Sequence, residues 1–482
     1  MRRPIRTSIS ESLKYLKINL SIQKYTVMNK FWKFFAVSSL SLVMWGCGGL
    51  GGDDDNTPVE TGQRDARGRV IIEGNITANR RLLSTEKYIL RGFVRVKAGA
   101  EIQIDPGTVV FGDKNTQGSL VIERGGRINA AGTVDKPIVF TSGEAPGQRN
   151  YGDWGGIVLL GNAPTNKPTT TGIEGVPDGP YGGTNAEDNS GVLRYVRIEF
   201  AGIPITPGNE INGLTMGGVG RGTTIEYVQV SFCGDDSFEW FGGNVNCRYL
   251  IAFRGWDDDF DADFGYSGRV QFGLGYRDPA INDQSVSNGF ETDNDAAGTA
   301  DTPFTSAVFS NISIFGPLGR GANVANLALW GRAAHIRRNS ELSIFNSLFT
   351  GYPEGLRLDG TATQAKVNSG ALEMTNNIFA GHTRNINIAG GATLPEIEAW
   401  FSAPNRNNRT FADFSTLGLN AQNFNMEAPG LLPAAGSPLL TGAAFTNAKL
   451  QTGFQAVTHI GAFGTTNWTQ GWANFNPQTT VY

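Results

Sequence analysis

The chain has 482 residues, 64 of them glycine, and its 40 basic and 44 acidic side chains leave a net charge of −4. Glycine is about twice as frequent as in an average protein, which favours one repetitive architecture with many tight turns. The sequence has no basic stripe with interleaved aromatic residues, and its densest charge is acidic, so we exclude nucleic acid as a partner. The three cysteines and three histidines are too few and too widely spaced for a Cys/His zinc site.

The N-terminus has the features of an export signal. Residues 1–27 are polar and basic without structural periodicity, and we interpret them as a mis-started segment upstream of the true start. Residues 28–46 hold a lysine-bearing start, an apolar run too short to span a bilayer, and a glycine before Cys47. They resemble a bacterial lipoprotein signal peptide, which implies lipidation of Cys47. A cleaved signal followed by an unrelated cysteine is the alternative.

Residues 47–67 include the stretch GGLGGDDDNTPVETGQ, which is glycine-rich and acidic and offers no core positions. Such a composition predicts a flexible tether. An acidic cluster directly after a lipidated cysteine resembles the surface-export signal of Bacteroidetes-type lipoproteins, and a plain solvated spacer is the alternative. We therefore expect a surface-exposed lipoprotein of the outer membrane, held to the membrane by its N-terminal lipid.

From residue 68 to residue 390 the pattern changes to short alternating strands separated by glycine. Runs such as VIIEGNI, FVRVKAGAEIQIDPGTVVFGD and SLVIERGGRINAAGTVDKPIVFTS show no helical periodicity between strands and few hairpin signals. This excludes a βαβ organisation and predicts an all-β fold, a parallel β-helix in which each coil stacks on the one before. Residues 161–190, rich in proline, glycine and threonine, form an insertion between coils.

The run from Val94 to Ser142, with its PGT, GG and KPIVFTS motifs, resembles the opening coils of right-handed parallel β-helix proteins of the pectate-lyase-like superfamily. Together with GDDSFEWFGG and GWDDDFDADFGYSG, the chain is more specifically similar to an uncharacterised group of Bacteroidetes-type β-helix lipoproteins. The resemblance implies the fold and little about the reaction, because the superfamily includes lyases, hydrolases and adhesins.

Residues 391–482 are expected to form a short helix and a capping segment. TLPEIEAWF has a threonine at the capping position, a proline in the first turn and a glutamate three residues after the threonine. The remaining residues resemble the closing segment of such β-helix proteins, and an exposed solenoid end requires a cap. We assign Trp468 and Trp472 to this cap, with sugar stacking as the alternative.

An acidic repeat is the most distinctive feature of the sequence. GDDSFEWFGG and GWDDDFDADFG align at an offset of 22 residues, and GFETDND is a third copy, 30 residues further on. Side chains alternate along a strand, so Phe238, Phe260 and Phe290 are predicted to face the core while Glu239, Asp261 and Glu291 face outward. Between Asp235 and Asp301 there are fourteen acids and four arginines, a local charge of −10.

Stacked carboxylates about 5 Å apart repel one another by about 3–4 kcal/mol at an effective dielectric constant of 20, and three arrangements would relieve this. Ca²⁺ could bind at oxygen ligands taken from Asp257, Asp259, Asp263 and Asp293. Protonation could create a general acid opposite a general base, with Glu239, Asp261 and Glu291 as catalytic candidates. Alternatively, the side chains are simply solvated. Resemblance to the superfamily's lyases implies calcium and an arginine base, for which Arg254 is the candidate, with Arg248 and Arg269 also nearby.

Two further expectations concern cysteine and histidine. Cys233 and Cys247 are placed apart by the coil alignment and are expected to be free thiols, with a disulfide as the alternative. None of the three histidines is expected near the acidic column. We predict a surface glycan-interaction or structural module that binds polysaccharide, Ca²⁺ being the one cofactor considered. The alternative is a polysaccharide lyase or glycoside hydrolase acting at residues 235–293.

Overall fold

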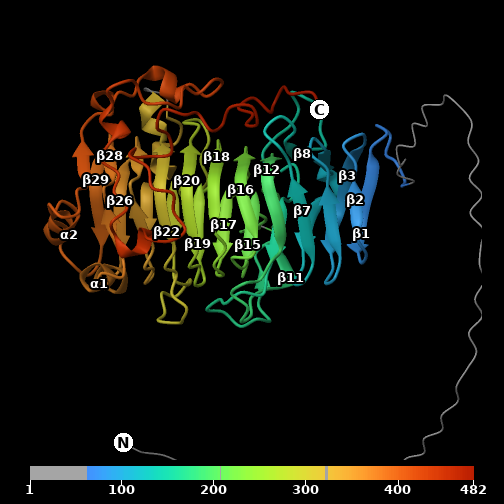
Figure 1. Ribbon diagram of the computed structural model, residues 1–482, viewed down its shortest axis with the longest axis horizontal. Coiled ribbons are helices and arrows are strands. Elements are labelled where there is room, and N and C mark those ends of the chain that lie inside the picture. Colours follow the sequence, from blue (N-terminus) through green and yellow to red (C-terminus); the bar gives the residue numbers. More distant parts are fainter. Residues whose placement is uncertain (1–61, 207, 321–323) are drawn as a thin grey trace, which may run out of the picture. The chain divides into compact units, whose positions relative to one another are not determined.

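The computed structural model describes residues 62–206, 208–320 and 324–482. The mis-started segment, the signal peptide, Cys47 and most of the tether lie outside these residues, so their assignments stay predictions. The described residues fold into a right-handed parallel β-helix, in which successive coils stack along one axis, as the sequence predicts (Figure 1). Within these residues no helix is long and apolar enough to cross a membrane.

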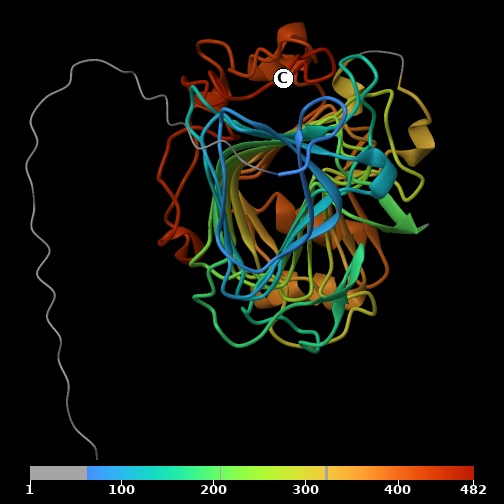
Figure 2. The ribbon, with the colours of Figure 1, turned by 90° about the vertical axis from the view of Figure 1, so that its right-hand side faces the viewer.

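Each coil contributes to three parallel sheets, which form the walls of the solenoid when it is viewed end-on (Figure 2). One of them, which we call the site sheet, carries the acidic repeat. It contains the second halves of β1 (Val70–Ile76) and β3 (Lys87–Val96), then β6 (Ser119–Ile122), β9 (Ile157–Leu160), β15 (Leu214–Gly217), β17 (Phe238–Phe241), β19 (Phe260–Asp263), β21 (Phe290–Thr292), β23 (Arg332–Ile336), β26 (Glu354–Asp359) and β29 (Arg384–Ala389).

The other two sheets share long strands that bend in the middle. The second sheet contains the first halves of β1 and β3, then β5 (Val109–Gly112), β8 (Ile138–Ser142), the second halves of β12 (Gly191–Glu199), β16 (Thr224–Ser231), β18 (Cys247–Phe253), β20 (Arg269–Tyr276) and β22 (Val308–Phe315), then β25 (Leu348–Thr350), β28 (Ile378–Ala380) and β30 (Arg409–Phe411). The third contains β2 (Arg80–Leu82), β4 (Glu101–Ile104), β7 (Arg127–Ala131), the first halves of β12, β16, β18, β20 and β22, then β24 (Ser343–Phe345) and β27 (Met374–Thr375).

The bend between the second and third sheets is made by a ladder of left-handed residues. Tyr195, Tyr227, Tyr249 and Phe272 have φ between 48° and 63°, and asparagines occupy the equivalent position in the later coils. Asparagine tolerates this conformation, whereas an aromatic residue is strained in it. The rings of successive residues in this ladder stack face to face, with centroids 4.3–4.9 Å apart. This stacking offsets part of the strain.

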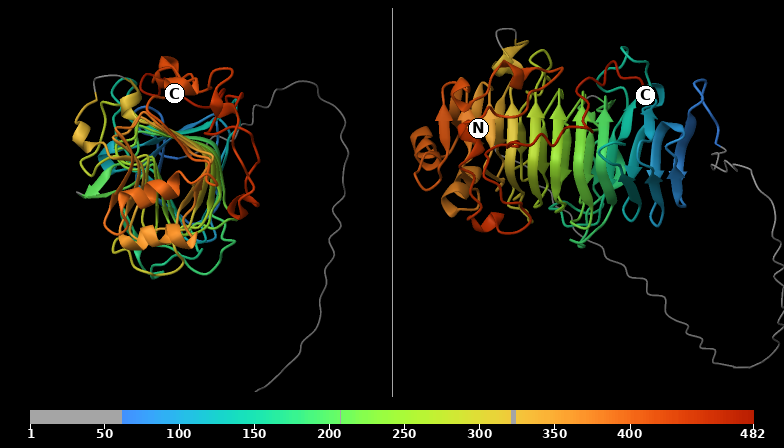
Figure 3. Two further views of the ribbon diagram at one scale, coloured as in Figure 1. Left: turned by 90° about the vertical axis from the view of Figure 1, so that its left-hand side faces the viewer. Right: turned by 45° about the horizontal axis from the view of Figure 1, so that its top comes forward.

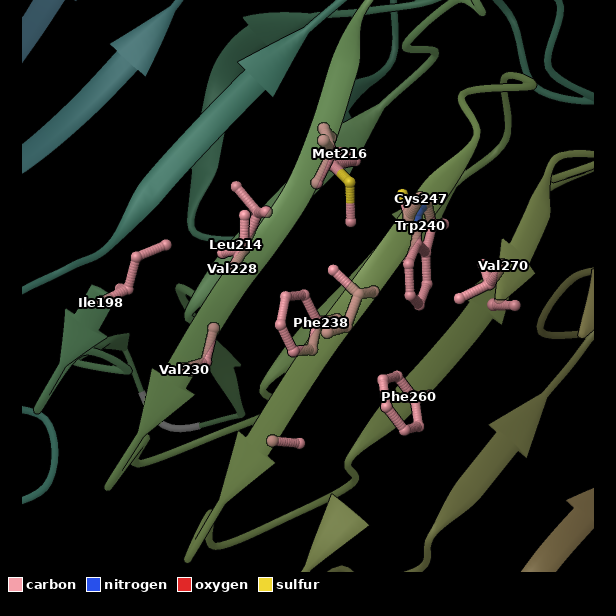
Figure 4. Packing of buried hydrophobic residues seen from close by; sticks show 14 of the residues in the cluster. Ile198, Leu214, Met216, Val228, Val230, Phe238, Trp240, Cys247, Phe260 and Val270 are labelled. Carbon is pink, nitrogen blue, oxygen red and sulfur yellow. The ribbon is translucent and has the colours of Figure 1, made fainter. Parts of the chain in front are cut away.

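The core is filled by inward side chains that repeat from coil to coil (Figure 4). Phe238, Phe260 and Phe290 are in register and almost fully buried, with ring centroids 5.8 and 5.2 Å apart. The predicted inward direction of these phenylalanines is therefore confirmed. Cys233 and Cys247 are both buried and unbonded, which confirms the expectation of free thiols.

Helices α1 (Thr361–Ser369) and α2 (Leu394–Phe401) lie at the last coils (Figure 3, left). Helix α2 has the predicted capping box, in which the Thr393 side chain accepts from the third helical residue and Glu396 accepts from the Thr393 backbone. Helix α1 interrupts the strand pattern and was not expected from the sequence. Two small antiparallel hairpins project from the coils: β10 (Gly172–Ile173) with β11 (Val176–Pro180), and β13 (Pro204–Thr206) with β14 (Asn209–Glu210).

The segment from residue 412 to residue 482, which we call the strap, contains short 3-10 turns and runs back along the side of the coils (Figures 1 and 3). Trp472 packs edge-on against Tyr195 and Tyr227, and Trp468 packs edge-on against Tyr249. Tyr482 reaches Glu199, to which its hydroxyl donates a hydrogen bond of 2.6 Å. The two tryptophans therefore cover the aromatic bend ladder rather than the open end of the solenoid.

Candidate functional site

The outward face of the site sheet carries one file of in-register side chains. The file runs from Val158 through Thr215, Glu239, Asp261, Glu291, His335 and Arg357, one residue per coil. Glu239, Asp261 and Glu291 thus lie on neighbouring coils as the sequence offsets predict. The file changes along the axis from apolar, through acidic, to basic side chains.

The acidic part of this file forms the floor of a cleft of about 750 Å³. Its carboxylates come from the floor and from the loops and hairpins that border it: Glu174, Glu210, Asp235, Asp236, Glu239, Asp257, Asp261 and Asp283. Glu174 belongs to the predicted insertion and lies between β10 and β11, so the insertion contributes to the cleft. Tyr151 and Trp256 contribute aromatic surface. Glu291 and the three candidate arginines are not among the residues that line it.

The repeated aspartates have a structural role in the stacking of the coils. Asp236 Oδ1 accepts a hydrogen bond of 2.7 Å from the backbone N–H of Asp258, and Asp258 Oδ1 accepts one of 2.5 Å from the N–H of Asn288. Asn288 continues the series by accepting from the N–H of Arg332. Each side chain thus pairs with the equivalent turn of the next coil, which explains why the acidic turn recurs at the coil period.

Three overlapping groups of carboxylates could hold a cation. They are Asp235 with Asp236 and Asp257, Asp236 with Glu239 and Asp261, and Asp258 with Asp261 and Glu291. In each group one oxygen from every residue lies within 4.8 Å of the others, which is close to the separation across a Ca²⁺ whose oxygen ligands are at about 2.3–2.6 Å. Every donor is a carboxylate oxygen, so the set suits a hard divalent cation rather than zinc or copper.

The carboxylates of the cleft have no ion-pair partner among the described residues. Asp235, Asp236, Glu239, Asp257, Asp258 and Asp261 make no ion pair with a lysine, arginine or histidine of the described chain. Burial and the neighbouring carboxylates raise the pKa of Asp236, Glu239 and Asp261 well above their ordinary values. The same two causes raise the pKa of Glu174 to about 7.

Glu239 is the most enclosed carboxylate of the floor, with 6% of its surface exposed. One of its oxygens accepts a hydrogen bond from the side-chain amide of Asn212. Glu291, one coil beyond Asp261, differs in having partners: Arg337 and His335 hold its pKa below the ordinary value although burial raises it. A carboxylate with ion-pair partners, Glu291, therefore lies one coil from a carboxylate without such a partner among the described residues, Asp261.

The four aspartates predicted as metal ligands differ in their surroundings. Asp257 is in the first carboxylate group and Asp263 lies two residues beyond Asp261 on β19. Asp293 is ion-paired with Arg337 and Arg338, at 2.7 and 2.6 Å. Asp259 is fully buried and pairs with Arg277, its Oδ1 lying 2.9 Å from the guanidinium nitrogen. The structure therefore brings Asp257 to the cleft and directs Asp259 and Asp293 to arginines.

Arg254 lies outside the cleft and is paired with Asp278 at 2.5 Å, with its guanidinium over the Phe232 ring. Arg248 and Arg269 lie beside Gly453 of the strap. No arginine borders the cleft, so the described part of the chain does not place the arginine base of the lyase hypothesis next to Glu239.

The expectation that no histidine lies near the acidic column was wrong. His335 is in register with Glu291, with Nδ1 3.3 Å from that carboxylate and Nε2 2.7 Å from Asp359. This register is not evident from the sequence, because the 44 residues from Glu291 to His335 match neither the 22-residue nor the 30-residue offset of the acidic repeat. Glu174, Asn212 and Trp256 were missed too, although Trp256 lies within the second copy of the acidic repeat, and that position was a usable signal.

The geometry defines a parallel β-helix protein with an acidic cleft on one sheet. Residues 74–420 match the family model described as the pectate-lyase like beta helix domain, and the chain belongs to this family.

Among solved structures, the chain is similar to the crystal structure of pectate lyase Pel9A, at 13% identity over 77% of this chain and 88% of that one, with a TM-score of 0.37. It is also similar to the Dettilon tailspike protein, at 12% identity over 67% of this chain and 62% of that one, with a TM-score of 0.24. No curated protein matches the sequence.

Proposed function

We propose that the chain is a surface-anchored glycan-binding module whose acidic cleft takes up a divalent cation, of which Ca²⁺ fits best, and an acidic polysaccharide. The observation that carries the proposal is the convergence on one cleft of five carboxylates that have no ion-pair partner among the described residues, in groups whose oxygens lie within 4.8 Å. Such a cluster is costly as it stands, because neighbouring carboxylates repel one another. A bound cation offsets this repulsion.

The chemistry of the cleft determines what can bind beside the cation. A bare acidic cleft repels anionic glycans and offers no cationic donor to bind them, since its lining contains no lysine or arginine. A cation reverses the local charge and accepts oxygen ligands from a sugar as well as from the protein. Binding of an acidic glycan is therefore expected to require the cation.

The location follows from the sequence alone. We propose that Cys47 carries the lipid and that residues 47–67 hold the coils away from the outer membrane, at the cell surface. A tether of this length lets the cleft reach polymers outside the membrane. Labelling of intact cells with a membrane-impermeant reagent tests this location, and protection of the protein until the cells are lysed contradicts it.

The binding proposal is tested by calorimetry with CaCl₂, and then with a panel of acidic and neutral polysaccharides in Ca²⁺ or in chelator. We expect Ca²⁺ binding, and acidic-glycan binding only when Ca²⁺ is present. The double variant Asp236→Asn/Asp261→Asn should lose both. Glu226→Gln is the matched control, because Glu226 pairs with Arg194 on another sheet. Glycan binding that is unchanged by chelator contradicts the cation requirement.

A second candidate function is cleavage of the glycan, and one observation favours it. Glu239 and Asp261 belong to one carboxylate group, and both have a raised pKa, so one can be protonated while its neighbour is ionised. Retaining glycosidases use such a closely spaced pair as acid/base and nucleophile. Release of reducing ends or unsaturated products, abolished in Glu239→Gln, would establish cleavage. Binding without any product across the panel would leave the binding module alone.

A further inference from the structure

The rim of the acidic cleft carries one strongly exposed tryptophan, Trp256. Trp256 exposes 38% of its surface. Of the strongly exposed large hydrophobic side chains in the described part of the chain, it is the one that is aromatic. It lies in the loop between β18 and β19 and directly precedes Asp257, a member of the first carboxylate group. An apolar ring in this position faces the same space as the candidate cation ligands.

The exposure of Trp256 does not result from a loose loop. Its backbone N–H donates a hydrogen bond of 2.9 Å to the carbonyl oxygen of Cys233. Its own carbonyl accepts one of 2.6 Å from the Ser287 hydroxyl and another of 2.9 Å from the buried Arg277 guanidinium. Three bonds to three different segments hold the backbone, so the ring has a fixed base at the edge of the cleft.

The ring of Tyr151 packs against the ring of Trp256. Tyr151 stacks on Trp256 with centroids 5.4 Å apart and an interplanar angle of 22°. Tyr151 also packs on Phe232, at 5.5 Å, and Phe232 carries the Arg254 guanidinium on its ring at 4.6 Å. Arg254 is itself anchored by Asp278. Arg254, which the sequence suggested as a catalytic base, thus packs against the aromatic stack of Phe232, Tyr151 and Trp256.

We propose that Trp256, backed by Tyr151, is a stacking subsite that takes the apolar face of a pyranose ring next to the sugar held at the carboxylate groups. The inference rests on the proposed function and specifies its ligand. It implies a chain of at least two sugar units, one with a flat face of C–H groups and one with a carboxylate or vicinal oxygens for the cation. Aromatic rings bind such faces through dispersion and C–H contacts, and a rigid ring does so with little loss of side-chain entropy.

The subsite also predicts which glycans bind. A polymer of acidic and neutral pyranose units, or a polyuronate in which every ring presents its C–H face, satisfies both subsites. A cation-binding polyanion without sugar rings, such as polyphosphate or polyglutamate, satisfies only the carboxylate groups. The expected order of affinity at equal charge is therefore acidic oligosaccharide above polyglutamate.

The test uses the purified protein in CaCl₂ with three probes: a hexamer of galacturonate, a hyaluronan hexasaccharide and polyglutamate. Trp256→Ala should weaken binding of at least one of the two oligosaccharides by about 10- to 100-fold, the effect of removing one stacked ring. Trp256→Phe should retain part of the affinity. Ca²⁺ binding without glycan should be unchanged in both variants, and circular dichroism should show unaltered folding.

Leu327→Ala is the matched control, because Leu327 is exposed by 53% and is not among the residues that line the cleft. Oligosaccharide binding by Trp256→Ala equal to that of the wild type overturns the stacking subsite while leaving the proposed function intact. Absence of oligosaccharide binding by the wild-type protein overturns the proposed function, and the subsite with it. A blue shift of tryptophan fluorescence on oligosaccharide addition, absent in Trp256→Phe, supports direct stacking.

Discussion

Asp259 and Asp261 are two residues apart in one acidic run, yet they experience opposite environments. Asp259 is fully buried and has the Arg277 guanidinium as its partner, which is fully buried as well. Asp261 faces the cleft among other carboxylates and has no cationic partner among the described residues. The same residue type therefore stabilises the fold at one position and destabilises it at the other when no cation is bound.

Asp259→Asn is expected to destabilise the protein by about 3–5 kcal/mol, because it leaves a buried guanidinium without its counter-charge. Urea unfolding at pH 7 in chelator measures this change. The double variant Asp259→Asn/Arg277→Met should recover a large part of the loss. A change below about 1 kcal/mol, the range of exposed ion pairs, would contradict the importance of the buried pair.

Asp261→Asn should act in the opposite direction under the same conditions. It removes one charge from a cluster in which burial and neighbouring carboxylates raise the pKa of Asp261. We expect a gain of about 1–3 kcal/mol in chelator, from like charges about 5 Å apart. Saturating Ca²⁺ should reverse the ranking, so that the wild type is the more stable protein. Loss of stability in chelator would show that Asp261 is already compensated.

His382 provides a pH-dependent test away from the cleft. Its Nδ1 accepts a hydrogen bond from the Tyr352 N–H and its Nε2 lies 3.2 Å from the Phe349 carbonyl. Burial lowers its pKa to about 4. A group with a lowered histidine pKa contributes full stability above the unfolded value of about 6.5 and loses it as the pH falls toward 4.

We therefore expect the wild type to lose about 2–3 kcal/mol more than His382→Gln between pH 7 and pH 4. The measurement is urea unfolding of both proteins at several pH values, since the difference between them cancels the other titrating groups. Parallel curves for the two proteins would show that His382 is not kept neutral by the fold.

The directions of most site-sheet residues could be predicted from the sequence, and the exceptions have a physical reason. Parity along a strand predicts that Phe260 faces in and Asp261 faces out, and both are confirmed by the register. Asp259 precedes β19, so parity does not apply to it, and its direction depends on Arg277 in the loop after β20. His335 was missed because its register depends on an intervening segment without a repeat signal.

At the scale of the element, local signals succeeded where a cap or a repeat defines the structure. The capping box and proline of α2 are read directly from TLPEIEAWF, and the observed helix covers Leu394–Phe401. Helix α1, TATQAKVNS, has few apolar residues and no side-chain cap at its N-terminus, so no pattern marks it. The strap is a long-range feature, because its partners Gln271 and Gln229 lie 184 and 245 residues before Gln455 and Asn474.

Two glutamine side chains of the coils form hydrogen bonds with the backbone of the strap. Gln271 donates from its amide to the Gln455 carbonyl at 2.7 Å and accepts from the Gln455 N–H at 2.8 Å. Gln229 binds Asn474 in the same two-bond manner, at 2.7 and 2.8 Å. Each pair satisfies both polar groups of one strap residue at a surface that is otherwise apolar and aromatic.

Gln271→Leu is expected to destabilise the protein by about 1–3 kcal/mol, because it leaves a backbone donor and acceptor of Gln455 without partners. Limited proteolysis should then cleave the strap near Gln455 faster than in the wild type. Gln148→Leu serves as the control, since Gln148 is exposed and its side chain makes no hydrogen bond to the described residues of the strap. Equal proteolysis of all three proteins would contradict a role for the Gln271 side chain in holding the strap.

For the whole molecule, the parallel stack means that each coil is stabilised by its two neighbours, so stability is passed along the axis from coil to coil. The carboxylate groups lie on consecutive coils, those of β17, β19 and β21, and Asp236 and Asp261 each belong to two groups. A cation at these groups would bind residues from adjacent coils at once. Cation binding is therefore linked to the stability of the middle of the solenoid.

A ligand that binds only the native state at 100 times its dissociation constant adds about 2.7 kcal/mol of stability. We expect Ca²⁺ at that excess to produce this gain, and chelator or Asp236→Asn/Asp261→Asn to abolish it. Hydrogen exchange should show where the gain arises: protection should rise most in β17, β19 and β21 and least in β1–β4 and β28–β30, because nearest-neighbour coupling weakens with each coil. Uniform protection along all coils, or none, would contradict a cation site in the cleft.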